Sequence, residues 1–250
     1  MSLNLKSLFK TKDAPKPAEP VKPAPAPIEE PVPEVNVPNL PRINLDITKY
    51  TGIQYYEQTT NKAQIVLHHT VSNPKCTAGD LDTWKSSKDK IGTHFIISYD
   101  GKITQCIPVE YWGHHIGCSS SWLQSRGFGD FSTRNNALNK MAIGIEIDAW
   151  GPVTQDGFTE YNKYMPEMLP IIKCDWRGAK YFQQYSEQQI ISLIELLRRL
   201  CAQFNIPYYG IMQEGLDVSQ NALSGRYGIW SHTSYRSDKS DIYQIGRAHV

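Results

Sequence analysis

Apolar residues along the chain gather in short runs with the spacing of β-strands. The run AQIVLHHT, 63–70, is apolar over IVL and then turns polar, which is typical of a buried strand that ends at a polar edge. In MAIGIEIDAW, 141–150, three isoleucines recur at every second position, so they share one strand face and Glu146 lies on the other. GIWSHT, 228–233, predicts a last short strand that leads into a polar loop.

A β-hairpin is predicted over GTHFIISYDGKITQCI, 92–107. Residues 95–97 form one arm, Asp100 and Gly101 the turn, and residues 103–107 the returning arm. Asp-Gly between two apolar runs favours this arrangement because both residues tolerate the left-handed backbone of a tight hairpin turn.

The helical pattern is clearest over 186–204. Ser186 is a plausible N-cap, and Gln189 three residues later completes a capping box. Asn205 and Pro207 end the pattern. The apolar residues that recur at helical spacing, which we expect to face the core, are Ile190, Ile194, Leu197, Cys201 and Phe204.

Together these elements predict an α/β fold over residues 43–244, a single domain with a mixed central β-sheet flanked by helices. Residues 1–42 differ: ten of the sixteen prolines lie between Pro15 and Pro41, so we expect a disordered, extended spacer. A docking peptide for a partner is the alternative. The end IGRAHV, 245–250, resembles a translated sequencing adapter and is treated as non-native, and 150–185 has no interpretable pattern.

Composition narrows the class of protein. The 250 residues are 40% hydrophobic and carry a formal net charge of +1, which gives no reason to expect nucleic acid as a partner. No apolar run approaches the roughly 18 residues of a membrane span. The five cysteines are odd in number and lack C-x2-C spacing, so we expect reduced thiols. We find no signal peptide at the start, and we expect a monomer.

Histidines and one acid at the ends of predicted strands suggest a metal site. His68 ends one strand, His232 ends another, and Asp241 follows in the next loop. Two imidazoles and one carboxylate are the usual protein ligands of a catalytic zinc ion. By spacing alone, unrelated core and surface histidines remain the alternative.

Five motifs in a fixed order strengthen this hypothesis: IVLHHT, GTHFIISYDGKI, WGHHIG, NKMAIGIEI and SHTSYRSDKSD. Together they resemble the zinc-dependent N-acetylmuramoyl-L-alanine amidases, the family of phage lysozyme-type amidases and peptidoglycan recognition proteins. The resemblance covers residues 43–243 and implies Zn²⁺ as cofactor, held by His68, His232 and Asp241. Many relatives have a proline after the third ligand where this chain has Ile242, so Asp238 stays the alternative third ligand.

The resemblance also implies two catalytic residues. Glu146 corresponds to an acidic residue on the I-G-I-E strand and would serve as general base and then as proton donor to the leaving amine. Lys239, two residues before Asp241, would place a positive charge near the oxyanion. For both residues the alternative is a solvated surface position.

Four further residues are predicted to contact substrate. His115 matches a groove-lining histidine of the family, and Thr93 stands where some relatives have a tyrosine. For His94 the alternative is a structural role, and for Trp112 it is packing in the core. If the register were shifted by one residue, His69 would replace His68, or His114 would replace His115. The predicted set is Thr93, His94, Trp112 and His115.

The expected activity is hydrolysis of the amide between N-acetylmuramic acid and L-alanine in bacterial peptidoglycan. A phage endolysin, held in the host cytoplasm until it reaches the cell wall, is the preferred biological setting. The alternatives are a cytosolic amidase that recycles wall fragments, a non-catalytic peptidoglycan-binding module, and a virion-associated wall-binding protein.

Overall fold

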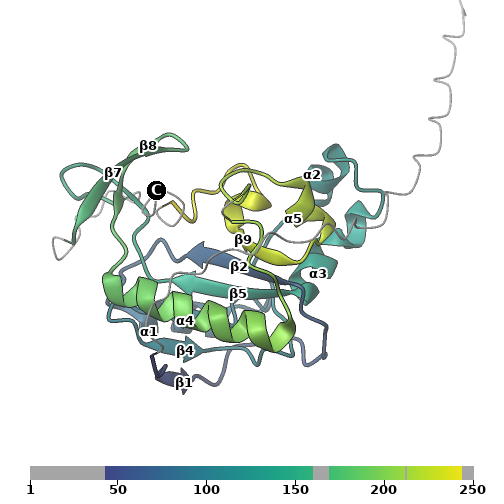
Figure 1. Cartoon of the computed structure of the whole chain (residues 1–250), viewed down its shortest axis with the longest axis horizontal. Coiled ribbons are helices and arrows are strands. Elements are labelled where there is room, and N and C mark those ends of the chain that lie inside the picture. The colour runs from purple at the N-terminus through teal and green to yellow at the C-terminus, as the bar shows by residue number, and fades with distance from the viewer. Residues whose placement is uncertain (1–42, 160–168, 212, 244–250) are drawn as a thin grey trace, which may run out of the picture. The chain divides into compact units, whose positions relative to one another are not determined.

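The computed structural model describes residues 43–159, 169–211 and 213–243 of the chain (Figure 1). The predicted spacer over 1–42 and the end over 245–250 lie outside these residues. The elements follow in the order β1 (Ile47–Lys49), β2 (Gln64–His69), α1 (Thr77–Ser86), β3 (Phe95–Ile97), β4 (Ile103–Gln105), α2 (Ser120–Ser125), α3 (Phe131–Met141), β5 (Ala142–Ile147), β6 (Pro152–Val153), β7 (Ile171–Trp176), β8 (Ala179–Gln183), α4 (Glu187–Phe204), α5 (Gln220–Ser224), β9 (Gly228–Ser231) and the 3₁₀ turn η2 (His232–Ser234).

A six-stranded sheet forms the centre of the fold, in the order β1-β4-β3-β5-β2-β9. Only the β3–β4 pair is antiparallel, so the sheet is mixed, as predicted. The three neighbours β5, β2 and β9 are parallel, and His68 of β2 is in register with Glu146 of β5. Parallel register brings the carboxyl ends of these strands to one edge, where the predicted site residues follow.

The two faces of the sheet are covered by different helices. The isoleucines of β5, with Ile65 and Leu67 of β2, pack against α4, which lies along the sheet in Figure 1. On the opposite face Val66 packs with residues of α2, α3 and α5, while Ile96 packs with Leu81 of α1. The polar residues His68 and Glu146 have the same strand parity as Val66, so they lie on this second face, between its two apolar clusters.

The predicted hairpin is present, but its returning strand is shorter than expected. β4 ends at Gln105 because the amides of Cys106 and Ile107 both donate to the carbonyl of His94 and leave the ladder. The turn holds Gly101 at φ 82°, as the Asp-Gly signal requires.

Helix α4 has the predicted ends and a buried face that overlaps the predicted stripe. Ser186 and Gln189 form the capping box, and Asn205 has a left-handed conformation at the C-cap. Of the predicted stripe Cys201 is buried, and Ile190, Leu197 and Phe204 are partly buried against the same core, which also contains Leu193, Leu196 and Leu200. Polar Gln189 is also buried on this side of the helix, and its Nε2 donates to the carbonyls of Ile97 and Asp148.

Residues 150–185, which gave no pattern, contain a second sheet with the order β6-β8-β7. Both pairs in it are antiparallel, and β7 and β8 form a hairpin that extends beyond the main sheet in Figure 1. β7 does carry a short apolar alternation, Ile172, Cys174 and Trp176, and these side chains pack on the main core, but this signal was missed.

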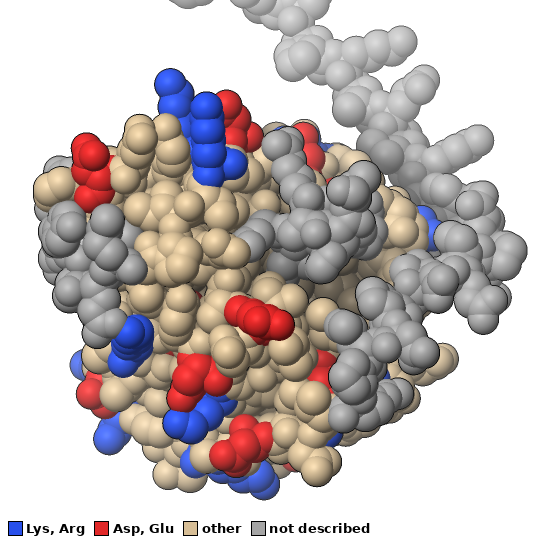
Figure 2. Space-filling model, turned by 60° about the vertical axis from the view of Figure 1, so that its left-hand side comes forward, with Lys and Arg blue, Asp and Glu red and all other residues tan. Residues whose placement is uncertain are grey.

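Two surface properties agree with the composition. Among the described residues no helix is both long and apolar enough to cross a membrane. On the face drawn in Figure 2, basic and acidic side chains are interspersed among uncharged residues. That distribution fits the near-neutral net charge of the chain.

Candidate functional site

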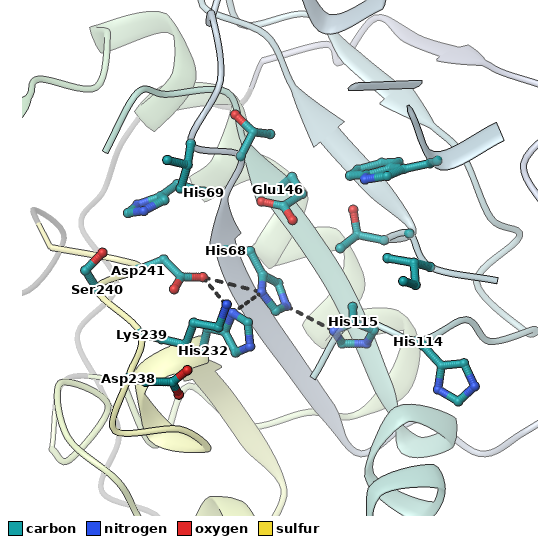
Figure 3. A pocket seen from close by; sticks show the side chains of 16 residues that line it. His68, His69, His114, His115, Glu146, His232, Asp238, Lys239, Ser240 and Asp241 are labelled. Carbon is teal, nitrogen blue, oxygen red and sulfur yellow. Dashed lines mark hydrogen bonds and ion pairs between the residues drawn. The ribbon is translucent and has the colours of Figure 1, made fainter. Parts of the chain in front are cut away.

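Three side chains from distant parts of the sequence converge at the carboxyl end of β2 (Figure 3). His68 Nδ1 lies 3.0 Å from His232 Nδ1. The Oδ2 atom of Asp241 lies 2.9 Å from His232 Nδ1 and 3.5 Å from His68 Nδ1. All three side chains are buried. The structure therefore brings together the residues predicted as metal ligands.

The spacing of these atoms suits a small divalent ion. In a tetrahedral zinc site with bonds of about 2.0–2.1 Å, two ligand atoms lie roughly 3.3 Å apart. The three observed separations, 3.0, 2.9 and 3.5 Å, lie on either side of that value. Two nitrogens and one oxygen are also the donor types that zinc accepts, so the residues fit the ion that the sequence implies.

Hydrogen bonds to the far side of each ring orient the two imidazoles. His232 Nε2 lies 2.9 Å from the carbonyl of Ile116 and donates to it, so in the neutral ring, the form that binds a metal, the Nδ1 lone pair faces Asp241. His68 Nε2 lies 3.0 Å from His115 Nδ1. If His68 donates to His115, its Nδ1 lone pair also points toward His232 Nδ1 and Asp241 Oδ2. Metal-binding histidines are commonly oriented by a hydrogen bond from the ring nitrogen that does not bind the metal.

The protonation states expected at this centre are those of metal ligands. Burial, together with the neighbouring His232, lowers the pKa of His68 to about 4, so the ring is neutral at pH 7. Burial would raise the pKa of Asp241, but His232 and His68 hold it well below its ordinary value. A neutral imidazole and an ionised carboxylate can bind a cation without first losing a proton.

Glu146 lies beside His68 on the neighbouring strand and carries an unsatisfied carboxyl oxygen. Its Oε2 atom is buried and has no hydrogen-bond partner among the described residues. Burial raises the pKa of Glu146 well above the ordinary value, the nearby Asp241 raises it further, and Lys239 opposes the shift. A buried carboxyl group with a raised pKa in a cleft is suited to proton transfer.

These residues line a pocket of about 420 Å³. Lys239 lines it from the loop before Asp241, and its side chain makes no hydrogen bond or ion pair in the described part of the chain. Thr93 and His115 line it from the side of β5. The Nε2 atom of His115 is buried without a hydrogen-bond partner among the described residues, so a donor remains available to a bound molecule.

Two of the predicted substrate contacts lie away from the pocket. His94 is fully buried, accepts from the Gly144 amide at Nδ1 and donates from Nε2 to the Tyr111 carbonyl. Trp112 stacks on Tyr56 with ring centroids 4.0 Å apart and is also buried. The structure does not bring either side chain to the pocket lining.

The structure distinguishes the predicted site residues from their alternatives Asp238, His69 and His114 by the partners that each side chain contacts. Asp238 forms an ion pair with Arg236 at 2.6 Å, whereas Asp241 faces the two histidines. His69 lines the pocket but pairs with Tyr185, 3.3 Å from its hydroxyl. His114 also lines the pocket and lies 3.4 Å from the Tyr56 hydroxyl.

Two residues that support the site were missed by sequence reasoning. Asn139 on α3 is fully buried, and its Oδ1 accepts from the amides of both His115 and Ile116. Gly144 on β5 allows His115 and Thr93 to approach: a Cβ there would lie 3.1 Å from the His115 ring and 2.9 Å from Thr93 Cγ2. Neither an asparagine nor a strand glycine suggests a catalytic or metal-binding role in the sequence, so their support of the site is visible only in the structure.

Residues 58–244 match the profile of a family described as N-acetylmuramoyl-L-alanine amidase. No curated protein sequence matches the chain. Among solved structures, the chain is similar to the N-acetylmuramoyl-L-alanine amidase LysC from Clostridium intestinale URNW at 20% identity and a TM-score of 0.42, covering 79% of this chain and 89% of that one.

Two further solved structures are similar at lower identity. The hydrolase AmiA of Staphylococcus aureus, in complex with its ligand, is 12% identical with a TM-score of 0.44, covering 81% of this chain and 73% of that one. The Drosophila peptidoglycan recognition protein SA is 14% identical with a TM-score of 0.43, covering 79% of this chain and 86% of that one.

Proposed function

The chain belongs to the N-acetylmuramoyl-L-alanine amidase family, and from that premise we propose that it hydrolyses the amide bond between N-acetylmuramic acid and L-alanine in peptidoglycan. His68, His232 and Asp241 would hold a zinc ion. When bound, zinc supplies Lewis-acid activation of water and of the scissile carbonyl. The convergence of these three buried donor atoms in a cleft is the observation that carries the proposal.

The side chains around this centre divide the remaining chemistry. Glu146 accepts a proton from the attacking water and returns it to the amine of the leaving L-alanine. Its unpaired, buried Oε2 is available for that transfer. Lys239 places its ammonium near the carbonyl oxygen as negative charge develops, and this stabilises the transition state.

His115 has a binding role in this proposal. Its Nδ1 accepts from His68, so the proton on Nε2 points to a group that the described residues do not supply. A carbonyl or hydroxyl oxygen of the substrate would satisfy this donor. Thr93, which lines the same pocket, would shape the neighbouring wall.

Metal analysis combined with a product assay tests the activity. We expect about one zinc per chain and release of new L-alanine amino termini from purified sacculi. Chelation and a His232→Ala variant should each abolish that release. Full activity after complete removal of metal would contradict the proposal, and metal-dependent wall binding without new amino termini would instead indicate a binding module.

We further propose that the substrate is polymeric wall, as for a phage lytic enzyme. The proline-rich composition between Pro15 and Pro41 supports this choice, because an extended spacer suits an enzyme tethered near a large substrate. An enzyme that acted only on small soluble fragments would have little use for a tether. Activity on soluble muropeptides together with no activity on intact sacculi would favour the wall-recycling alternative.

A further inference from the structure

Beyond buried Tyr235 and the Arg236–Asp238 ion pair, the loop that carries Lys239 has little support of its own. Residues 235–240 follow η2 and belong to no helix or strand, yet they lead directly to the buried Asp241. Two pockets border this loop. Lys239 and Ser240 line the pocket that contains the histidines, and they also line a second pocket together with Arg177 and Gly178 of the β7–β8 hairpin. A segment with open space on two sides depends on contacts from other elements for its position.

The tip of the β7–β8 hairpin has a demanding backbone. Trp176 pairs with Ala179, so Arg177 and Gly178 form a two-residue turn. Arg177 has φ 47° and Gly178 has φ 86°, both in the left-handed region. Glycine accepts this conformation readily, whereas arginine does so at a cost that other contacts must offset.

Those contacts reach the loop that carries Lys239. Arg177 Nη1 donates to the carbonyl of Ser237 at 2.7 Å, and Trp176 Nε1 donates to the carbonyl of Ser240 at 3.1 Å. The two bonds lie on either side of the Asp238–Lys239 dipeptide. Arg177 also donates from Nη2 to Asp217 Oδ1 at 2.9 Å, which fixes the guanidinium from behind.

We propose that Trp176 and Arg177 are positioning residues, which hold the segment Ser237–Ser240 so that Lys239 faces the reacting carbonyl. This inference rests on the proposed amidase function. Arg177 acts on the backbone before Lys239, and Trp176 acts on the residue before Asp241. The small sheet thus contributes to catalysis through the loop it supports, without contacting the reacting atoms.

Three variants and a matched control test the proposal in the full-length zinc-loaded protein. Arg177→Ala removes the hydrogen bond to the Ser237 carbonyl and the ion pair with Asp217, whereas Arg177→Lys keeps one positively charged donor. Trp176→Phe keeps an aromatic ring but removes the indole N–H. Arg199→Ala is the control, because Arg199 on α4 likewise donates to a carbonyl, that of Ile43 at 3.0 Å, and to an acid, Glu195 at 3.3 Å. Backbone hydrogen exchange of residues 237–241, kcat, KM and zinc content are measured for each.

We expect faster exchange of residues 237–241 in Arg177→Ala and Trp176→Phe, and unchanged exchange there in Arg199→Ala. For Arg177→Ala, kcat on sacculi should fall about 10- to 100-fold, with little change in KM or zinc content, because a misplaced Lys239 affects the transition state. Arg177→Lys should recover part of the loss, since lysine donates at one point where arginine bridges two groups.

Two results would overturn the positioning role: exchange and kcat no different from the control, or faster exchange without a loss of kcat. Failure of the proposed function would look different. Wild-type protein would then release no L-alanine termini, while the exchange comparison would still report whether the hairpin holds the loop.

Discussion

At the scale of single residues, Glu146 has a chemical environment unlike that of an ordinary strand glutamate. It shares its register position with His68, its Oε2 lacks a hydrogen bond among the described residues, and burial raises its pKa. Folding alone gives no reason to keep a carboxyl group there, because a neutral residue of the same size would avoid the cost of burial.

Replacing Glu146 by glutamine tests its role in proton transfer. We expect Glu146→Gln to lower kcat about 10²- to 10⁴-fold while zinc content is retained, since the amide keeps the shape and loses the base. Glu57→Gln, at an exposed position, serves as control. Product assays on sacculi with parallel metal analysis measure both properties, and a Glu146→Gln enzyme as active as the control would remove Glu146 from the mechanism.

His94 gives a pH-dependent contribution to stability. Burial lowers its pKa to about 3, whereas an unfolded histidine titrates near 6.5. The unfolded state therefore binds more protons between these values, so the contribution is complete above about pH 6.5 and is lost as the pH falls. From pH 7.5 to pH 5 the loss should be about 2 kcal/mol.

A glutamine at position 94 separates this titration from the other buried groups. Its amide offers one acceptor and one donor for the Gly144 amide and the Tyr111 carbonyl, as His94 does, but does not titrate. Denaturant unfolding at fixed zinc concentration should therefore show a shallower acid loss for His94→Gln than for wild type. Equal pH dependence in both proteins would show that His94 is not the group responsible.

The convergence of His68, His232 and Asp241 was largely predictable from the sequence, whereas the residues that support these side chains were not. His68 and His232 follow predicted strands, and parallel pairing brings such ends together. The choice between Asp238 and Asp241 needed coordinates, because both lie in one polar loop and only the fold directs Asp241 inward. His94 and Trp112 lie in motifs that predicted substrate contact, but both side chains are buried in the interior. The spacing of residues in the sequence does not distinguish these two roles.

At the scale of elements, β5 must leave room for a histidine ring. A Cβ at Gly144 would lie 2.9 Å from Thr93 and 3.1 Å from His115, so Gly144→Ala should displace the ring from His68. We expect a loss of about 1–3 kcal/mol in unfolding free energy from overpacking, together with lower activity.

Gly129→Ala provides the matched control for this prediction, since a Cβ there meets nothing within 4 Å. Chemical denaturation and product assays on both variants distinguish a crowded site from a general effect of alanine. If the two variants behave alike, the close approach at Gly144 is not a constraint.

The elements that the sequence predicted carry either an apolar run or a local signal at a turn or a cap. The Asp-Gly turn and the capping box of α4 have local signals, and both are present. The predicted apolar stripe of α4 largely packs on the core, but the burial of Gln189 against two backbone carbonyls had no signal in the apolar pattern. The small sheet was missed although Ile172, Cys174 and Trp176 of β7 alternate with polar residues and pack on the main core, because so short an alternation is a weak signal.

At the scale of the whole molecule, the proposed ion links β2 to the loop beyond β9. A ligand that binds only the folded state stabilises it, by about 2.7 kcal/mol at a concentration one hundred times its dissociation constant. We therefore expect chelation to lower the melting temperature by several degrees and zinc to restore it. His232→Ala should melt at a temperature that does not respond to zinc, and a similar zinc response in that variant would place the ion elsewhere.

The separation of 164 residues between His68 and His232 also has a consequence for protein synthesis. β2 is made early, but its neighbours β5 and β9 follow much later, and Asp241 later still. A ribosome must therefore release nearly all of the folded region before the three donor atoms can meet. Nascent chains would remain inert toward their substrate throughout translation, and activity would appear only once Asp241, beyond the final strand, has joined the two histidines.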